Sequence, residues 1–389
     1  MNWFRNSRTG WLAGLAASIA VGALLAGCGG GDDTAAATKT SAPGTPAATT
    51  AGGLPANVGK DDRASLTGAG ATFPAPLYQA WFDDYNKGVA KGVQVNYQPV
   101  GSGGGINQFT AGTVDFGASD APMSDDELGK APDAQHVPTA IGAVVLTYNL
   151  SGVQSLKLDG DTLAKIYLGT IKKWDDPAIA ALNAGVKLPS ADIQVVYRSD
   201  SSGTTFVFTD YLSKVSADWK TKVGTNKAPN WPTGQGGKGN DGVTGVVKNT
   251  PNAIGYVELT YAATNKLSFA DMKNKAGKFV TPTVDSASAA AAGATIPAGY
   301  RVSITNADGD TSYPIASFTY LLVFKSTAKC SQQTPLVDML WWVFHDSGAQ
   351  ATIKELSYSP LPKALLPLVE ATLQGLKCDG GAKASLKAG

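Results

Sequence analysis

The sequence predicts an α/β fold in which strands and helices alternate through two domains. A chain of 389 residues is long enough for two domains. Short apolar runs repeatedly end in small polar loops and are followed by amphipathic runs, which is the order strand, loop, helix. Two longer apolar runs, Val137–Leu150 and Tyr313–Phe324, interrupt this alternation, and we interpret them as strands that cross between the domains.

Residues 1–27 have the features of a signal peptide. Arg5 and Arg8 make the start positive, and Trp11–Leu25 is apolar but too short to span a membrane comfortably. The segment ends in Leu-Ala-Gly before Cys28, which resembles the lipobox of bacterial lipoproteins, where the peptidase cuts before the cysteine and the thiol is lipidated. The alternative is an ordinary cleavage site with a chance cysteine. We expect a lipid on Cys28 that anchors the exported protein to a membrane.

Residues 28–64 consist mainly of Gly, Ala, Thr, Ser and Pro. Such a segment cannot bury enough apolar surface to offset the conformational entropy that ordering would cost. We therefore interpret residues 28–64 as a flexible tether between the lipid and the folded part of the chain.

Charge and cysteine content exclude several classes of protein. Lys+Arg 32 against Asp+Glu 31 gives +1, and removal of the two signal-peptide arginines leaves about −1 (+1 minus 2), without the basic surplus of a nucleic-acid binder. Apart from Cys28, the cysteines are Cys330 and Cys378, which lack a Cys-x-x-Cys spacing and can form a disulfide after export. His136 and His345 lie far apart in the sequence, so we expect no metal site.

In the first domain, three predicted strands end in polar loops that precede helices. Pro74 and Pro76 suit the first turn of a helix. Asp120 follows the third strand directly, and ligands of open α/β sheets bind at the carboxyl ends of strands. The predicted elements are a strand starting at Ser65, helix Leu77–Asn86, strand Val93–Tyr97, loop Gly101–Gly105, a helix from Ile106 and strand Val114–Ser119.

The second domain continues the alternation, and the chain ends in helices after the second crossing strand. The predicted elements are helices Thr162–Leu168 and Pro177–Leu182, strand Ile193–Tyr197, helix Phe206–Val215, loop Trp231–Gly242, a helix from Val243, strand Ala253–Leu259, and helices Ser286–Ala292, Pro335–Phe344 and Leu361–Leu376. The aromatic cluster at 341–344 is expected to lie in the core.

The loop Arg198–Phe206 connects a predicted strand to a predicted helix. Its Ser, Thr and Gly residues suit a helix N-terminus, whose free N–H groups can bind an anion. Arg198 adds guanidinium donors that match an oxyanion, and Asp200 can hold Arg198 in place by an ion pair. An ordinary N-cap loop remains the alternative.

Several long motifs resemble those of the PstS family, the periplasmic phosphate-binding proteins of bacterial phosphate ABC transporters. The resemblance extends from about Ser65 to Glu370. The motifs are Leu66–Pro76, Val114–Pro122, Ile166–Gly169, Ile171–Asp176, Gly236–Gly242 and Ala253–Glu258.

This resemblance implies a two-lobed α/β periplasmic-binding-protein fold of the Venus-flytrap, type II class, with two open sheets flanked by helices and joined by a two-strand hinge. Lobe 1 would comprise 65–142 and 318–389, and lobe 2 would comprise 143–317. Phosphate would bind in the cleft between the lobes. Asp200 would orient Arg198 from outside the ligand shell. The implied phosphate ligands are Thr72, Phe73, Ser102, Asp120, Arg198, Ser202, Gly203 and Thr204.

The resemblance also implies the biological setting. The protein would be a monomer that carries no cofactor or metal and catalyses no reaction. It would deliver phosphate to the permease and ATPase subunits of the transporter, from the periplasm or the cell surface. The sequence departs from the family pattern at Gly103, where Ser is frequent, and at Ser201, where Gly is usual.

A carboxylate such as Asp120 is unexpected in an anion site, because it would repel the anion. The proton that phosphate carries resolves this. Phosphate carries a proton at neutral pH, and a carboxylate can accept it. Sulfate carries none, so it would face an unpaired and repelling group. Arsenate also carries a proton and is not distinguished from phosphate by this argument.

Other readings of the sequence have weaker support. A hydrolase that uses Ser201, Ser202 or Thr204 would lack a Gly-x-Ser-x-Gly elbow. The Gly runs at 101–105 and 234–242 do not fit the nucleotide-binding pattern Gly-x4-Gly-Lys-Ser/Thr. Residues 306–310 suggest a calcium loop but lack its full spacing and terminal Glu, so we predict a turn there.

Overall fold

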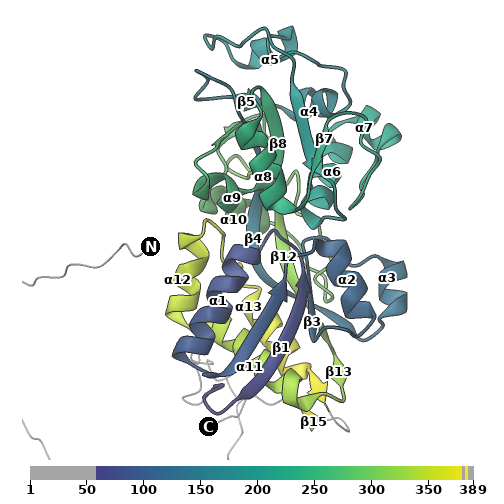
Figure 1. Cartoon of the computed structure of the whole chain (residues 1–389), viewed down its shortest axis with the longest axis vertical. Helices are drawn as coiled ribbons and strands as arrows, with labels where there is room; N and C mark the ends of the chain where they lie inside the picture. The colour runs from purple at the N-terminus through teal and green to yellow at the C-terminus, as the bar shows by residue number, and fades with distance from the viewer. Residues whose placement is uncertain (1–57, 379–381, 384–389) are drawn as a thin grey trace, which may run out of the picture. The chain divides into compact units, whose positions relative to one another are not determined.

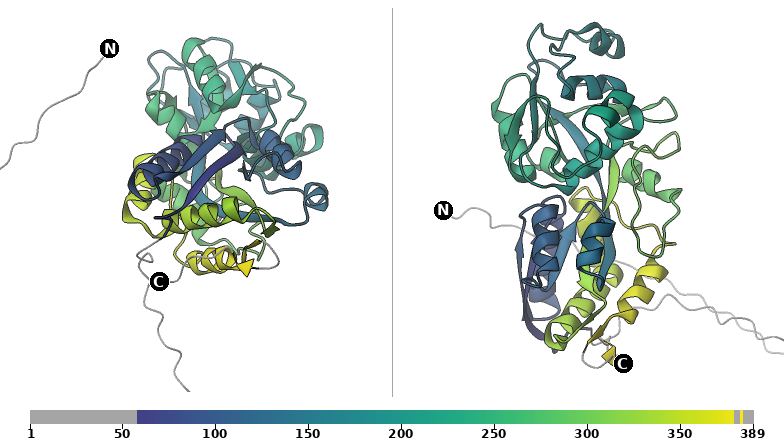
Figure 2. Two further views of the ribbon diagram at one scale, coloured as in Figure 1. Left: turned by 60° about the horizontal axis from the view of Figure 1, so that its bottom comes forward. Right: turned by 90° about the vertical axis from the view of Figure 1, so that its right-hand side faces the viewer.

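One nine-stranded sheet carries both halves of the protein, as the computed structural model shows for the residues that it describes, 58–378 and 382–383. The strand order is β2-β1-β3-β12-β4-β8-β6-β7, and β9 (Ser268–Phe269) pairs with β4 beside this path. Helices pack on the sheet in both halves (Figures 1 and 2).

The predicted signal peptide, Cys28 and most of the predicted tether lie outside the described residues. The end of the tether was placed too late, because residues 58–64 belong to the folded unit. Val58 is only 6% exposed within the core, and β1 begins at Arg63. In the part of the chain that the structure describes, no helix is both long and apolar enough to cross a membrane.

The first half is built on three parallel strands, β1 (Arg63–Gly70), β2 (Gly92–Gln98) and β3 (Phe116–Ser119). Because these strands are parallel, the segments that follow them leave the sheet at the same edge. The helices of this half are α1 (Ala75–Gly88), α2 (Ser102–Thr110), α3 (Asp125–Lys130), α11 (Cys330–His345), α12 (Ser347–Glu355) and α13 (Leu366–Gly375).

Helix α2 begins at Ser102, whereas the sequence predicted a glycine loop and a helix from Ile106. Gly101 turns the chain with φ 88°, in the left-handed region that favours glycine. A Cβ at Gly105 would lie 2.4 Å from the Cα of Gly70. The glycines therefore bring the first turn of α2 against β1, and their helical conformation is imposed by this packing.

The second half contains β6 (Gln194–Arg198), which pairs in parallel with β7 (Gln235–Gly237) and β8 (Ala253–Glu258). A small separate sheet of β5 (Lys157–Leu158), β10 (Asp271–Lys273) and β11 (Phe279–Val280) completes it. The helices of this half are α4 (Gly160–Tyr167), α5 (Pro177–Leu182), α6 (Gly203–Val215), α7 (Ala217–Lys222), α8 (Gly239–Asn249), α9 (Leu259–Thr264) and α10 (Val284–Ala292).

Two strands, β4 (Ala134–Tyr148) and β12 (Ala316–Phe324), connect the halves (Figure 1). They are the crossing strands expected from the sequence. Residues 134–143 of β4 pair with β12, and residues 144–148 pair with β8. The two predicted sheets are thus continuous through β4. Burial of β4 on both faces explains why most of its residues are apolar.

The C-terminal helices differ from the prediction in their boundaries. Helix α11 starts at Cys330, five residues before the expected start at Pro335, and α13 starts at Leu366. The prediction of a disulfide is confirmed, because Cys330 and Cys378 are bonded, with their Cα atoms 5.2 Å apart. This bond joins the start of α11 to a small sheet of β13 (Ser326–Thr327), β14 (Lys377–Cys378) and β15 (Ala382–Lys383).

Candidate functional site

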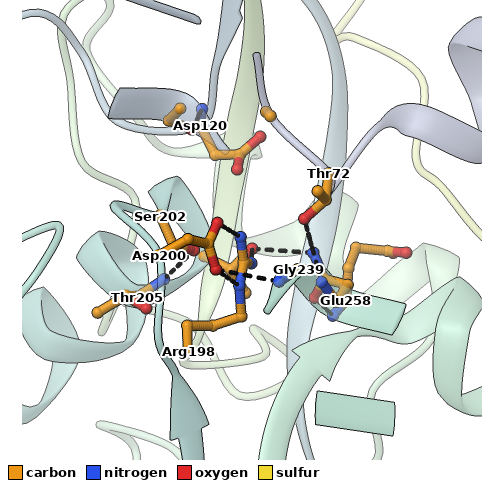
Figure 3. A network of polar contacts seen from close by, with 12 residues as sticks. Thr72, Asp120, Arg198, Asp200, Ser202, Thr205, Gly239 and Glu258 are labelled. Carbon is orange, nitrogen blue, oxygen red and sulfur yellow. Dashed lines mark hydrogen bonds and ion pairs between the residues drawn. The ribbon is translucent and has the colours of Figure 1, made fainter. Parts of the chain in front are cut away.

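Segments from both halves meet at the ends of the parallel strands. The first half contributes the turn after β1, the start of α2 and the turn after β3, and the second half contributes the turn after β6 and the start of α8. Figure 3 shows Thr72 and Asp120 facing Arg198, Asp200 and Ser202. The structure therefore brings together the residues that the sequence grouped: Thr72, Phe73, Ser102, Asp120, Arg198, Asp200, Ser202, Gly203 and Thr204.

Thr72 and Phe73 form the turn between β1 and α1. Tyr261 donates a hydrogen bond to the Thr72 carbonyl, and Tyr358 donates one to the Phe73 carbonyl at 2.6 Å. The C=O of Thr72 and the N–H of Phe73 belong to one trans peptide, so fixing the carbonyl directs the N–H to the opposite side. Among the described residues, none accepts a hydrogen bond from the Phe73 N–H. This turn therefore offers a donor.

Asp120 follows β3 and is 1% exposed. Its Oδ1 accepts a hydrogen bond from the Thr319 hydroxyl at 2.8 Å, and its backbone N–H donates to Ser102 Oγ at 3.3 Å. Burial raises the pKa of Asp120 to about 7, although the bond from Thr319 and the charge of Arg198 act to lower it. The N-cap of α3 is Ser124, so Asp120 does not serve as the cap of that helix.

Arg198 ends β6 with its side chain buried. Its Nε and Nη2 donate to the two carboxylate oxygens of Asp200 at 2.8 and 2.6 Å, which is a bidentate pair. Burial acts to raise the pKa of Asp200, but Arg198 and the Gly239 N–H, which donates to it at 3.0 Å, hold that pKa below its usual value. The remaining Nη1 donates to Thr204 Oγ1 at 3.3 Å, so Arg198 is fixed in one orientation.

The N-terminus of α6 faces Asp120. Ser202 caps it by accepting a hydrogen bond from the Thr205 N–H at 3.1 Å, which leaves the first two helical N–H groups, those of Gly203 and Thr204, without an intrahelical partner. A Cβ at Gly203 would lie 2.4 Å from Ser102 Oγ and 2.5 Å from Asp120 Oδ2. Only glycine allows the helix to approach the first half this closely.

Asn240, at the start of α8, is a site residue that sequence reasoning missed. Its fully buried side chain donates to Thr72 Oγ1 at 2.8 Å and to Thr204 Oγ1 at 3.2 Å. It thus joins one residue of each half. The signal was its position inside the Gly236–Gly242 motif, but a glycine-rich run gives no reason to single out one asparagine.

The hydroxyl groups of the site are oriented as donors. Thr72 Oγ1 accepts from Asn240, Ser202 Oγ accepts from a backbone N–H, and Thr204 Oγ1 accepts from both Arg198 and Asn240. Because their oxygens already accept, their own hydrogens remain for another acceptor. The site therefore combines several donors and the Arg198 cation with the Asp120 carboxylate, while the Asp200 carboxylate is occupied by Arg198.

Further contacts join the two halves around these residues. Gly103 N–H donates to the Ser201 carbonyl at 3.0 Å. Helix α3 forms ion pairs with the second half, Glu127 with Lys227, and Asp125 with Arg301 at 2.8 Å. The two positions that depart from the family pattern, Gly103 and Ser201, are therefore in direct backbone contact with each other.

Neither histidine is placed to activate a serine. The Nε2 of His136 accepts a hydrogen bond from the Met123 N–H at 3.0 Å, and burial lowers the pKa of His136 to about 4. The two ring nitrogens of His345 contact the Trp341 carbonyl and Glu370. Within residues 58–378 and 382–383, no group of three or more His, Cys, Asp or Glu side chains could hold a metal ion.

Comparison with known proteins assigns the family. The model of the PBP superfamily domain matches residues 39–338. The phosphate-binding protein PstS of Pasteurella multocida is 47% identical over 311 residues, which cover 79% of this chain and 89% of that protein. The chain belongs to the PstS phosphate-binding protein family. The phosphate-binding protein PstS of Xylella fastidiosa is 46% identical over 79% of this chain and 84% of its own.

Solved structures agree with the fold. A high-affinity periplasmic phosphate-binding protein (PfluDING), solved with bound phosphate at pH 8.5, is 25% identical and superposes with a TM-score of 0.66 over 79% of this chain and 93% of its own. The two-lobed α/β fold expected from the sequence is therefore confirmed.

Proposed function

We propose that this protein is the phosphate-binding subunit of a phosphate ABC importer, which captures inorganic phosphate between its two halves and delivers it to the membrane permease. The observation that carries this proposal is the composition of the site. Oriented hydroxyls, helix N–H groups and Arg198 supply donors for a tetrahedral oxyanion, while Asp120 supplies an acceptor for its proton.

The ligands in this proposal are Thr72 and Phe73 through hydroxyl and backbone N–H, Ser102, Asp120 and Arg198, and the Ser202, Gly203 and Thr204 turn. Asp200 does not touch phosphate but keeps the Arg198 guanidinium in place. No cofactor or metal takes part, and the protein binds phosphate as a monomer without chemical change.

The proposed domain organisation follows the two crossing strands. Lobe 1 comprises 65–142 and 318–389 with the additional folded residues from 58 onward, and lobe 2 comprises 143–317. Strands β4 and β12 form the hinge.

Residues 1–27 are a signal peptide, and Cys28 carries a lipid that holds the exported protein at a membrane through the tether. Mass spectrometry of the native N-terminus should find a diacylglyceryl-modified Cys28, and an unmodified N-terminus elsewhere would refute the anchor.

One titration tests the proposed function. Calorimetry of the mature protein with phosphate, arsenate and sulfate should give one-to-one binding of phosphate and no competing binding of sulfate at equal concentration. Absence of phosphate binding, or equal binding of sulfate, would overturn the proposal. Turnover of a chromogenic phosphoester under the same conditions would indicate an enzyme.

A further inference from the structure

Glu258 is a buried carboxyl group that the proposed ligand set does not use. It is the last residue of β8, is 0% exposed, and pairs in register with Val144 of the crossing strand β4. Its Oε2 accepts a hydrogen bond from the Thr260 N–H at 2.8 Å, which caps α9. Its Oε1 has no hydrogen-bond partner among the described residues. Figure 3 shows it beside the Thr72 turn.

The surroundings of Glu258 disfavour a negative charge. An ionised carboxylate in an apolar interior is costly unless a cation accompanies it. Asp200 has Arg198 as such a partner, whereas the charged group that acts on Glu258 is another acid, Asp120. Burial raises the pKa of Glu258 well above its usual value, and the charge of Asp120 raises it further, although hydrogen bonding with Thr260 and Tyr358 acts to lower it. Geometry and charge therefore agree on a neutral carboxylic acid.

Two tyrosines connect the surroundings of Glu258 to the anion-binding turn. Through Oε2, Glu258 fixes the start of α9, and α9 carries Tyr261, whose hydroxyl holds the Thr72 carbonyl. Tyr358 also lies close enough to the carboxyl group to lower its pKa, and it donates its own hydrogen to the Phe73 carbonyl at 2.6 Å. A Cβ added at Gly142 would meet both the Phe73 ring, at 2.5 Å, and Glu258 Oε1, at 3.3 Å.

We propose that Glu258, as a neutral acid, is a positioning residue that holds two consecutive carbonyls of the Thr72–Phe73 turn through Tyr261 and Tyr358. A protonated carboxyl group does not compete for the Tyr358 hydrogen, which therefore stays with the Phe73 carbonyl. The turn then presents its hydroxyl and N–H to the anion. An ionised Glu258 would instead attract the Tyr358 hydrogen away from Phe73 and repel the anion. This inference rests on the proposed function.

The test compares phosphate affinities of purified variants by calorimetry. Glu258→Gln keeps the shape and a donor, so its affinity should stay within about twofold of wild type. Glu258→Ala and Tyr358→Phe each break a connection to the turn and should bind phosphate about tenfold more weakly. Glu370→Gln, which alters an acid paired with His345, serves as the matched control and should bind as wild type does.

Three calorimetric results would overturn the inference. The first is an unchanged phosphate affinity in a folded Glu258→Ala variant, and the second is a loss of affinity in Glu258→Gln equal to that in Glu258→Ala. The third is at least tenfold tighter phosphate binding by Glu258→Gln, which would reveal an ionised Glu258. If Glu258→Ala does not fold, the Gln and Tyr358→Phe variants decide.

A second readout does not depend on phosphate. The infrared spectrum of the wild type at neutral pH should contain a protonated-carboxyl band that Glu258→Gln lacks, while the contribution of Asp120 cancels in the difference. Absence of this band overturns the inference. If the wild type binds no phosphate, the proposed function fails, and the band still decides whether Glu258 is a neutral acid.

Discussion

Replacement of Asp120 by Asn should stabilise the ligand-free protein, and the gain should depend on pH. The substitution keeps the shape of the side chain, and the remaining carbonyl oxygen can still accept the Thr319 hydrogen bond, now 2.8 Å long. It removes the negative charge of Asp120, a residue that is only 1% exposed and lies against the start of α6.

The magnitude follows from the pKa of Asp120, which burial raises from 3.8 to about 7. Because the folded-state pKa lies above the unfolded one, ionisation of Asp120 destabilises the folded protein. The penalty is absent below pH 3.8, grows as the pH rises, and is complete above about pH 7. Each pH unit corresponds to about 1.4 kcal/mol, so the full penalty is at most about 4 kcal/mol. Asp120→Asn removes it.

Denaturant unfolding of phosphate-free protein at a series of pH values measures this effect. The unfolding free energy of Asp120→Asn should exceed that of wild type above pH 7 and should converge with it near pH 4. The exposed Asp84, substituted by Asn, is the control and should follow the wild type at every pH. Parallel curves for wild type and Asp120→Asn would refute the argument that Asp120 is a buried acid with a raised pKa.

The same variant tests anion selectivity. At a pH where Asp120 is ionised, Asp120→Asn should still bind phosphate, because one acceptor oxygen remains for the P–OH group. Sulfate should gain affinity, because the repelling charge is replaced by a donor. Calorimetry with both anions gives the ratio, and an unchanged ratio would show that Asp120 does not read the proton of the anion.

Three further variants or treatments test other parts of the site and fold. Arg198→Ala should weaken phosphate binding at least tenfold, since a hydrogen bond to a charged group contributes about 1.5–3 kcal/mol; unchanged affinity in calorimetry would place the anion elsewhere. Asn240→Ala should lower both phosphate affinity and the unfolding free energy, the latter by about 1–3 kcal/mol, because it leaves buried partners unsatisfied; stability equal to wild type in denaturant titrations would contradict this. Reduction of the Cys330–Cys378 bond, which closes a separation of 48 residues, should lower the unfolding free energy by at most about 4 kcal/mol without changing phosphate affinity. An altered affinity after reduction would show that this bond supports the site.

The sequence predicted the long strands and most helices, although it missed α7, α9 and α12, and it grouped most residues of the candidate site. The turn at Arg198–Phe206 could be recognised because its residues act locally: a helix N-terminus, its cap and a nearby cation are all encoded within nine residues. The crossing strands were also predictable, since a strand buried on both faces is rich in apolar residues.

Contacts between distant segments could not be predicted from the sequence. Asn240 orients Thr72, from which it is separated by 168 residues, and no local pattern encodes that relation. The early start of α2 has the same origin, because glycines disfavour a helix unless packing favours it, and here Gly105 packs against β1 while Gly103 lies against Ser201. Glu258 lay within the predicted strand Ala253–Leu259 and was given no role, because its surroundings come from β4 and from Tyr358 in the C-terminal part of the chain.

The close approach at Gly203 has a consequence for how the binding space acquires its size. The main chain of α6 and the side chains of Ser102 and Asp120 leave less room between them than a single methyl group needs. The separation here is therefore limited on one side by the backbone of α6 and on the other by the Ser102 and Asp120 side chains. A larger residue at 203 would push the start of α6 away from Ser102 and Asp120, and so would separate the two halves at the site.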